Sequence, residues 1–155
     1  MEKATFAAGC FWGVEEAFYE TSGVNASRVG YTGGTLDQPT YQQVCTGTTG
    51  HAEAVEVVFD PEKISYQALV ELFFTIHDPT QRNGQGVDIG PQYRSSIFYH
   101  DEQQRQIAEQ VLERIDTSGR FRSSIVTEIV PATTFWEAES YHQKYYQKNS
   151  CGCGF

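Results

Sequence analysis

The residues of this chain that could do chemistry are first of all its four cysteines, Cys10, Cys45, Cys151 and Cys153. In a reducing compartment such cysteines are rarely structural disulfides. Their scatter also differs from that of a zinc site, which shows paired cysteines or added histidines at short spacing, so we expect no metal and no cofactor. The cysteines are therefore buried apolar thiols, reactive thiols, or a mixture of the two.

Cys10 has the most informative position, because a strand is predicted to end just before it and a helix to begin just after it. A thiol at a helix start faces unpaired backbone N–H groups, which lower its pKa and favour the nucleophilic thiolate. Gly9 and Gly13 leave space for a ligand, and Phe11 and Trp12 place two rings beside the thiol. The alternative is that Cys10 is a small buried hydrophobe and that both rings belong to the core.

Glu53 is the second candidate for chemistry. It shares one face of a predicted strand with Val55, Val57 and Phe59, so its carboxylate points toward apolar surroundings. Desolvation there raises the pKa of a carboxyl group, and an acid that stays protonated near neutral pH can donate a proton. The alternative places Glu53 at the strand's end, where its carboxylate reaches water.

The elements that must position these residues alternate between strands and helices. Strands are expected over 4–8, 27–31, 53–59, 93–99 and 123–130, and helices over 11–19, 66–77, after 101, and over 135–147. A loop rich in Gly, Pro, Asn and Asp spans 78–92, and a long irregular loop is often functional. This order predicts an α+β or α/β fold in which helices pack on an open sheet.

Length and charge narrow the class of protein. The chain has 155 residues, with 20 acidic and 11 basic side chains and a net charge of -9. This size favours one domain, and the acidic balance disfavours binding to nucleic acid or to an anionic membrane. No apolar run approaches the roughly 20 residues that span a bilayer. The first residues lack the basic start and apolar stretch of a signal peptide, so we expect a cytoplasmic protein.

Five short segments carry most of the distinctive residue types. They are Gly9–Gly13 (GCFWG), Val29–Gly34 (VGYTGG), Gly50–Val55 (GHAEAV), Gly90–Ser95 (GPQYRS) and Ala138–Gln143 (AESYHQ). Tyr41 precedes the third segment, and Asp88 precedes the fourth. In this order the segments resemble the A-type peptide methionine sulfoxide reductases, and the resemblance spans nearly the whole chain.

The resemblance implies a fold and an activity. The fold is an α+β two-layer sandwich with a mixed β-sheet and packed helices, built on a ferredoxin-like core. The activity is reduction of the S epimer of methionine sulfoxide, free or in proteins, which repairs oxidative damage. Cys10 matches the attacking cysteine, which becomes a sulfenic acid, and Glu53 matches the acid that protonates the sulfoxide oxygen.

The resemblance also assigns the residues around the substrate. Phe11 and Trp12 match the residues that line the pocket for the methyl group. Tyr41 and Tyr93 match phenols that hydrogen-bond the sulfoxide oxygen, and Asp88 matches a polar residue of the same site. Two phenols can stabilise charge on oxygen without carrying charge of their own.

In the resemblance, cysteines near the C-terminus regenerate the attacking thiol. We expect a single catalytic domain over residues 1–148 and a flexible, cysteine-bearing tail over 149–155. A tail thiol, Cys153 or Cys151, condenses with the Cys10 sulfenic acid to a disulfide, which thioredoxin reduces in the family. The family's frequent Asn-Pro is Asn149-Ser150 here. The choice between the two thiols, or a relay through both, therefore stays open, and Cys45 is interpreted as non-catalytic.

Two other functions compete with this interpretation. One is a thiol peroxidase or general thiol–disulfide oxidoreductase, which uses the same sulfenic acid or disulfide chemistry but needs no aromatic methyl pocket. The other is a metal-binding or peptide-binding module built on the CGC tail and an aromatic groove. Neither accounts for five ordered segments.

Overall fold

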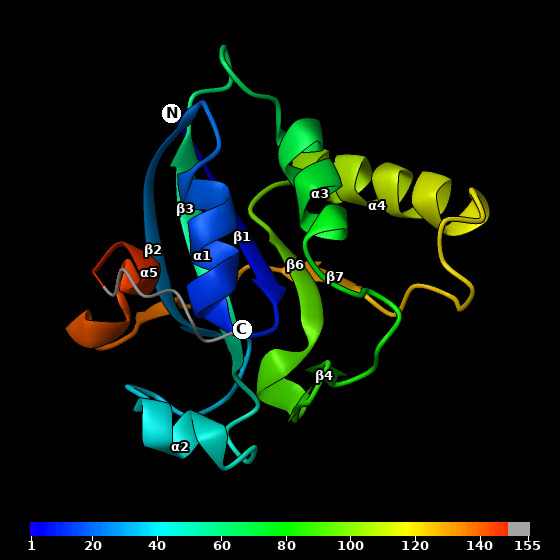
Figure 1. Cartoon of the computed structure of the whole chain (residues 1–155). Coiled ribbons are helices and arrows are strands. Elements are labelled where there is room, and N and C mark those ends of the chain that lie inside the picture. The colour runs from blue at the N-terminus through cyan, green and yellow to red at the C-terminus, as the bar shows by residue number, and fades with distance from the viewer. Residues whose placement is uncertain (149–155) are drawn as a thin grey trace.

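The computed structural model describes residues 1–148 and confirms the predicted α+β class. Within these residues the chain builds a six-stranded sheet in the order β7-β6-β1-β3-β2-β8 (Figure 1). Its strands are β1 (Glu2–Ala8), β2 (Val24–Thr32), β3 (Ala52–Phe59), β6 (Ser95–Tyr99), β7 (Glu128–Pro131) and β8 (Trp136–Glu137). A separate ribbon pairs β4 (Gly84–Gln85) with β5 (Asp88–Ile89).

Helices of very different length lie between the strands or follow the last one. The α-helices are α1 (Phe11–Tyr19), α2 (Tyr41–Cys45), α3 (Tyr66–Thr75), α4 (Glu102–Thr117) and α5 (Tyr145–Lys148). Two short 3-10 helices, η1 (Pro91–Tyr93) and η2 (Ser140–His142), complete the described elements.

The sheet is mixed, as predicted. Strand β1 runs antiparallel to β3 and to β6, and β3 runs antiparallel to β2, whereas β6 and β7 are parallel. Neighbouring central strands therefore run in opposite directions. The ends of β1 and β2 lie at the same end of the sheet as the starts of β3 and β6, which is the lower end in Figure 1.

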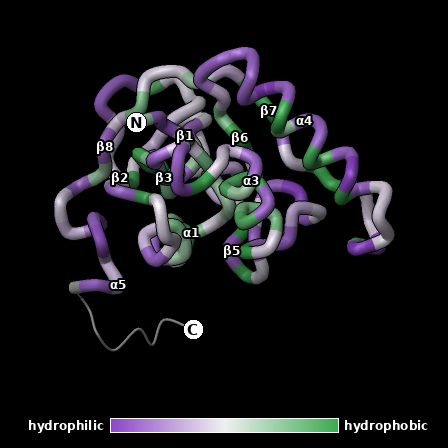
Figure 2. The backbone as a smooth tube through the Cα atoms, turned by 90° about the horizontal axis from the view of Figure 1, so that it is seen from above, coloured by the Kyte–Doolittle hydropathy of each residue, from purple (hydrophilic) through white to green (hydrophobic). Residues whose placement is uncertain are grey.

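Helices α1, α3 and α4 cover one face of this sheet, where the main core lies. Phe6 and Val57 from the sheet pack there with Phe18, Leu69 and Phe73 from the helices, and none of these side chains is exposed. Each such side chain contributes about 1.5–3 kcal/mol by its burial. Seen from above in Figure 2, α4 lies toward one edge of the sheet, and β8 and α5 lie toward the other.

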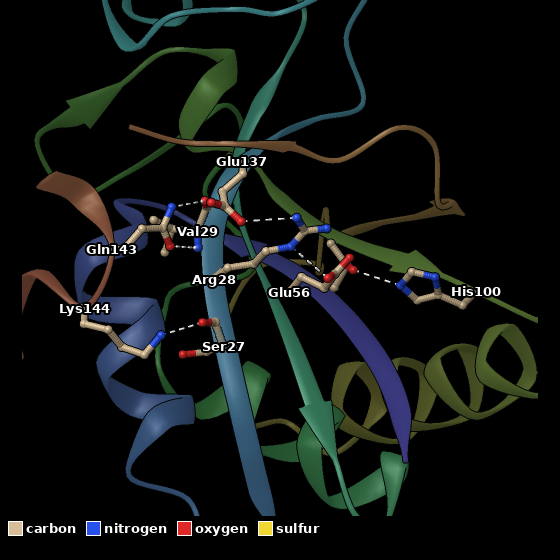
Figure 3. A network of polar contacts seen from close by, with 9 residues as sticks. Ser27, Arg28, Val29, Glu56, His100, Glu137, Gln143 and Lys144 are labelled. Carbon is tan, nitrogen blue, oxygen red and sulfur yellow. Dashed lines mark hydrogen bonds and ion pairs between the residues drawn. The ribbon is translucent and has the colours of Figure 1, made fainter. Parts of the chain in front are cut away.

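Side chains rather than helices cover the opposite face. A small cluster there contains Ala54 and Phe98 with Phe135 packed against it. Arg28 lies 4.7 Å from the Phe135 ring centroid and pairs with Glu56 through an Nε–Oε1 distance of 2.9 Å (Figure 3). Within residues 1–148 the two-layer architecture expected from the resemblance is confirmed.

Local signals predicted most helix starts well. The helix expected over 11–19 matches α1. The Ser65 side chain accepts a hydrogen bond from the backbone of Ala68 at the start of α3, and Asp101 accepts one from Gln104 at the start of α4. Both are side-chain N-caps, which replace partners that a helix end lacks.

The helix expected over 135–147 is wrong. The chain instead forms β8, η2 and α5. Residues of β8 pair with Gly30 and Tyr31 at the edge of β2, and the Ala138 backbone donates to the Val29 carbonyl at 2.9 Å. The free edge of β2 thus takes up backbone groups that a helix would have paired internally.

The observed bounds of two strands also differ from the predicted ones. The strand expected over 123–130 is reduced to β7, and the strand expected from residue 93 begins at Ser95. The β4–β5 ribbon lies in the segment 78–92, which was expected to be an irregular loop, and helix α2 lies in a segment for which no element was expected. Both elements are too short to give a hydrophobic period. No helix in the described part of the chain is long and apolar enough to cross a membrane.

Candidate active site

Cys10 lies at the junction of β1 and α1, as the sequence predicted, and is half-buried. It occupies the N-cap position, and its side chain makes no capping hydrogen bond. Gly9 before it has φ of +97°, and a Cβ there would come within 2.8 Å of Cγ of Gln85. A glycine is needed at this point because the ribbon that carries Asp88 packs directly on it.

Glu53 lies near the start of β3 and is only 1% exposed. Its Oε1 accepts a hydrogen bond from the Phe11 backbone N–H at 3.2 Å, so the acid is tied to the first residue of the helix that Cys10 caps. Its Oε2 is buried and has no hydrogen-bond partner among the described residues. The expectation of a buried acid at this position is confirmed.

Burial raises the pKa of Glu53 to about 8 from its ordinary 4.5. The Phe11 N–H opposes this shift, and the charge of Asp88 adds to it. At neutral pH the carboxyl group is therefore mostly protonated. It is able to donate a proton through Oε2, which has no hydrogen-bond partner within residues 1–148.

The pKa of Cys10 contradicts one expectation from sequence. Burial, followed by the charge of Glu53, raises it to about 11, although hydrogen bonds from the Trp12 and Gly13 backbones lower it. The helix start favours the thiolate, as expected, but desolvation and a neighbouring carboxylate outweigh it. In the free protein the thiol thus holds its proton at neutral pH.

Aromatic rings gather beside this pair. The Phe11 ring centroid lies 5.8 Å from that of Tyr31 and 6.5 Å from that of Tyr41. Trp12 stacks on Tyr145 with a centroid distance of 3.8 Å and an angle of 8° between the planes. The two rings predicted to line a pocket, Phe11 and Trp12, therefore belong to one aromatic group that includes side chains from β2, α2 and α5.

The two predicted phenols belong to the same electrostatic surroundings. Burial raises the pKa of Tyr93 to about 12, and Glu53, Cys45, Asp88 and Cys10 add to the shift. Tyr93 lies on η1, which packs against β3, the strand that carries Glu53. The Arg94 guanidinium holds η1 in place, since its Nη1 donates to the Pro91 carbonyl at 2.8 Å.

Tyr41 begins α2 and is the second phenol. Burial, contact with the Cys45 thiol and the charge of Glu53 raise its pKa. Cys45 itself is exposed at the surface. Partial desolvation by its neighbours and the charge of Glu53 still raise its pKa, which disfavours a reactive thiolate. The interpretation of Cys45 as non-catalytic stays a prediction, and Cys151 and Cys153 lie outside the described residues.

Sequence reasoning missed two residues of this site. The Tyr31 hydroxyl donates to Oε1 of Glu139 at 2.9 Å, and the Tyr41 backbone donates to Oε2 of the same carboxylate at 3.0 Å. Burial would raise the pKa of Glu139, but these hydrogen bonds hold it below its ordinary value. Tyr31 pairs with Glu53 across β2 and β3, so strand register was the signal that could have found it.

The two histidines of the motifs take different places. His51 ties loops together: its Nδ1 accepts from the Gly34 backbone at 3.0 Å, and its Nε2 lies 2.7 Å from the Leu36 carbonyl. His142 is buried against the aromatic group instead and accepts a hydrogen bond from the Trp12 indole. Within residues 1–148 no three His, Cys, Asp or Glu side chains are placed to hold a metal ion.

A thiol beside a neutral, buried acid can attack an electrophilic atom while the acid protonates the oxygen that this atom carries. The rings around the pair offer apolar contact to a small alkyl group. Chemistry of this kind belongs to a cysteine-dependent oxidoreductase.

Comparison with known proteins narrows this class to one family. The family described as Peptide methionine sulfoxide reductase matches residues 2–153. A curated relative from Methanothermobacter thermautotrophicus, named Peptide methionine sulfoxide reductase MsrA, is 60% identical over 148 residues, which cover 96% of this chain and 88% of the relative. The chain therefore belongs to the peptide methionine sulfoxide reductase family, and it is a thiol-dependent reductase of methionine sulfoxide.

Solved structures agree with this assignment. Mxr1 from Saccharomyces cerevisiae in reduced form has a TM-score of 0.91 at 36% identity, with 97% of this chain and 87% of that chain covered. The same yeast protein in complex with Trx2 has a TM-score of 0.66 at 26% identity, with 93% and 84% covered. The fold and the enzyme class expected from the sequence are confirmed.

Proposed function

We propose that Cys10 attacks the sulfur of the S epimer of methionine sulfoxide and that Glu53 protonates its oxygen. One observation carries this assignment. Glu53 is buried beside the Cys10 helix start, anchored through Oε1 to the Phe11 N–H, and its Oε2 has no partner within residues 1–148. A sulfoxide becomes a good electrophile only when its oxygen is protonated or strongly hydrogen-bonded, and Oε2 supplies that proton.

The proposed reaction transfers one oxygen atom. The Cys10 sulfur forms a bond to the sulfoxide sulfur while the Glu53 proton moves to the oxygen. The oxygen then passes to Cys10 as a sulfenic acid, and methionine leaves with its sulfur reduced by two electrons. Cys10 is oxidised by the same two electrons, so the step needs no other redox partner.

The remaining site residues hold the substrate in this proposal. Phe11 and Trp12 surround the methyl group, and the Tyr41 and Tyr93 hydroxyls hydrogen-bond the sulfoxide oxygen. Burial raises the pKa of both phenols, so they remain neutral donors at neutral pH. Asp88 supplies a polar contact to the substrate from β5, in the ribbon that packs on Gly9.

A second thiol completes the cycle. We assign this role to Cys153 or Cys151, in a tail over 149–155 that follows a catalytic domain over 1–148. Condensation of the tail thiol with the sulfenic acid releases water and forms a disulfide, which thioredoxin reduces by exchange. A similar yeast structure in complex with Trx2 supports this partner. The need for reduced thiols supports a cytoplasmic location.

An assay with racemic methionine sulfoxide tests the proposal. With thioredoxin and its reductase, the wild type should consume one epimer only, and Cys10→Ser should lose turnover completely. Glu53→Gln should keep more activity than Glu53→Ala, because an amide still donates a hydrogen bond. Retained turnover in Cys10→Ser, or equal rates for wild type and Glu53→Ala, would reject the mechanism.

The same assay separates attack from recycling. A variant with both Cys151→Ser and Cys153→Ser should release about one methionine per enzyme and then stop. Single replacements identify the resolving thiol, and mass spectrometry of the oxidised protein locates the disulfide. Full thioredoxin-driven turnover in the double variant would reject the tail assignment while leaving the role of Cys10 intact.

A further inference from the structure

His142 makes a specific contact with one wall of the proposed pocket. It ends η2, is 1% exposed, and its Nδ1 lies 2.9 Å from the Trp12 indole Nε1. An indole N–H can only donate, so the Nδ1 of His142 must be the acceptor. The proton of the neutral imidazole then lies on Nε2, which is buried and has no hydrogen-bond partner among the described residues.

Two contacts fix the Trp12 indole in complementary ways. Stacking on Tyr145, at 3.8 Å and 8°, sets the plane of the indole but leaves it able to slide or turn within that plane. The hydrogen bond to His142 joins the indole at its edge and removes this remaining freedom. Together they give Trp12 one orientation.

The His142 ring also fills space between the other site residues. Its centroid lies 4.5 Å from that of Tyr41 and 5.1 Å from that of Phe11. The backbone N–H of His142 donates to the carbonyl of Glu139, the residue whose carboxylate binds Tyr31 and Tyr41. The His142 ring therefore packs against Phe11 and Tyr41. The segment from Glu139 to His142 holds this ring and also binds the backbone of Tyr41.

We propose that His142 is a positioning residue for sulfoxide reduction, holding the Trp12 indole, through Nδ1, in the orientation that closes the methyl pocket. This inference rests on the proposed function, because the role of Trp12 as a pocket wall belongs to it. Burial lowers the pKa of His142, which keeps Nδ1 free to accept. The methyl group of the substrate is apolar and offers no directional contact, so the pocket must be shaped before the substrate arrives.

Paired substitutions of His142 test the acceptor. His142→Leu removes it, whereas His142→Asn places an amide oxygen near the position of Nδ1. Loss of one hydrogen bond that orders a site residue should reduce kcat/KM by about tenfold in His142→Leu, mainly through KM. His142→Asn should remain within about threefold of the wild type. Equal losses in both variants, or no loss in His142→Leu, would overturn the proposal.

A double-substitution cycle separates positioning from general stability. If His142 acts through Trp12, His142→Leu should cause almost no further loss of kcat/KM in a Trp12→Phe background. A loss of similar size in both backgrounds means a role independent of Trp12 and would overturn the proposal. If His142→Leu does not fold, His142→Phe keeps an aromatic ring without the acceptor and replaces it in the cycle.

Fluorescence provides a readout that does not depend on activity. The chain has two tryptophans, so Trp136→Phe leaves Trp12 as the only one. In that background His142→Leu should move Trp12 emission to longer wavelength, and His142→Asn should leave it close to the starting value. Unchanged emission in His142→Leu would overturn the positioning role. A normal fluorescence response without methionine sulfoxide reduction would instead reject the proposed function alone.

Discussion

The central pair of residues, Cys10 and Glu53, holds two protons in the free protein at neutral pH. Burial raises the pKa of Glu53 to about 8 and that of Cys10 to about 11, and the charge of Glu53 adds to the shift of Cys10. The reactive pair is a thiolate with a neutral acid, which carries only one proton. One proton must therefore leave before attack, and the remaining one lies mostly on sulfur, since the acid is the stronger of the two.

This proton count predicts the pH dependence of the reduction step. The kcat/KM for methionine formation, which reports the free enzyme, should rise through about pH 8 and level off above it, because the singly protonated pair is half formed at the pKa of Glu53 and becomes the dominant form at higher pH. In Glu53→Gln the rise should continue to higher pH, since only Cys10 is left to ionise. Single-turnover rates from roughly pH 6 to 10, a range that brackets the titration of Glu53, compare the two profiles. A common inflection near pH 8 in both proteins would contradict the coupling.

The element that completes the site is the segment from β8 to α5, and side chains hold it to the sheet. The Gln143 amide bonds both the N–H and the carbonyl of Val29, each at 2.8 Å, and so takes the place of a neighbouring strand residue (Figure 3). Its Nε2 also donates to the Ala138 carbonyl at 3.0 Å. This one side chain thus ties His142 and Tyr145, its near neighbours in sequence, to the edge of β2.

Replacing Gln143 with Ala should loosen the whole segment. Val29 is fully buried, so the lost partner leaves its backbone N–H unpaired, at a cost of about 1–3 kcal/mol in the free energy of unfolding. Urea unfolding measures this cost, and hydrogen exchange should show faster opening of residues 138–147. Gln147→Ala is the matched control, because within residues 1–148 the Gln147 side chain bonds only the carboxylate of Glu16, at the surface of the protein. Equal stability of both variants would contradict the role given to Gln143.

Elements that make their own hydrogen bonds were the ones that the sequence predicted well. Helix α1 and the caps of α3 and α4 follow from nearby residues, and Glu53 follows from the period-two face of β3. The helix expected over 135–147 failed because the β2 edge, over a hundred residues earlier, takes its backbone groups. The raised pKa of Cys10 was missed for the same reason, since burial and the Glu53 charge come from tertiary packing.

At the scale of the whole molecule, two buried groups give opposite dependences of stability on pH. The pKa of Glu53 is raised in the folded state, so its contribution to the free energy of unfolding falls as pH rises from 4.5 to about 8. His77 acts in the opposite direction, because burial lowers its pKa from 6.5 to about 4. Its contribution to the free energy of unfolding therefore grows as pH rises from about 4 to 6.5. The site acid thus destabilises the protein at the pH at which it is needed.

Glu53→Gln should therefore stabilise the protein, and more so as pH rises. Relative to wild type, its free energy of unfolding should increase by about 1.4 kcal/mol for each pH unit between 4.5 and 8 and stay constant above that. His77 is present in both proteins, so its contribution cancels in this difference. Well below pH 4.5 the Glu53 side chain of the wild type is neutral in the folded protein and in the unfolded chain, as the glutamine of the variant always is. The difference in the free energy of unfolding at such a pH therefore measures packing alone. Urea unfolding at pH 4, 6 and 8 (roughly spanning the titration) tests this, and a difference independent of pH would mean that Glu53 ionises as freely in the folded protein as in the unfolded chain.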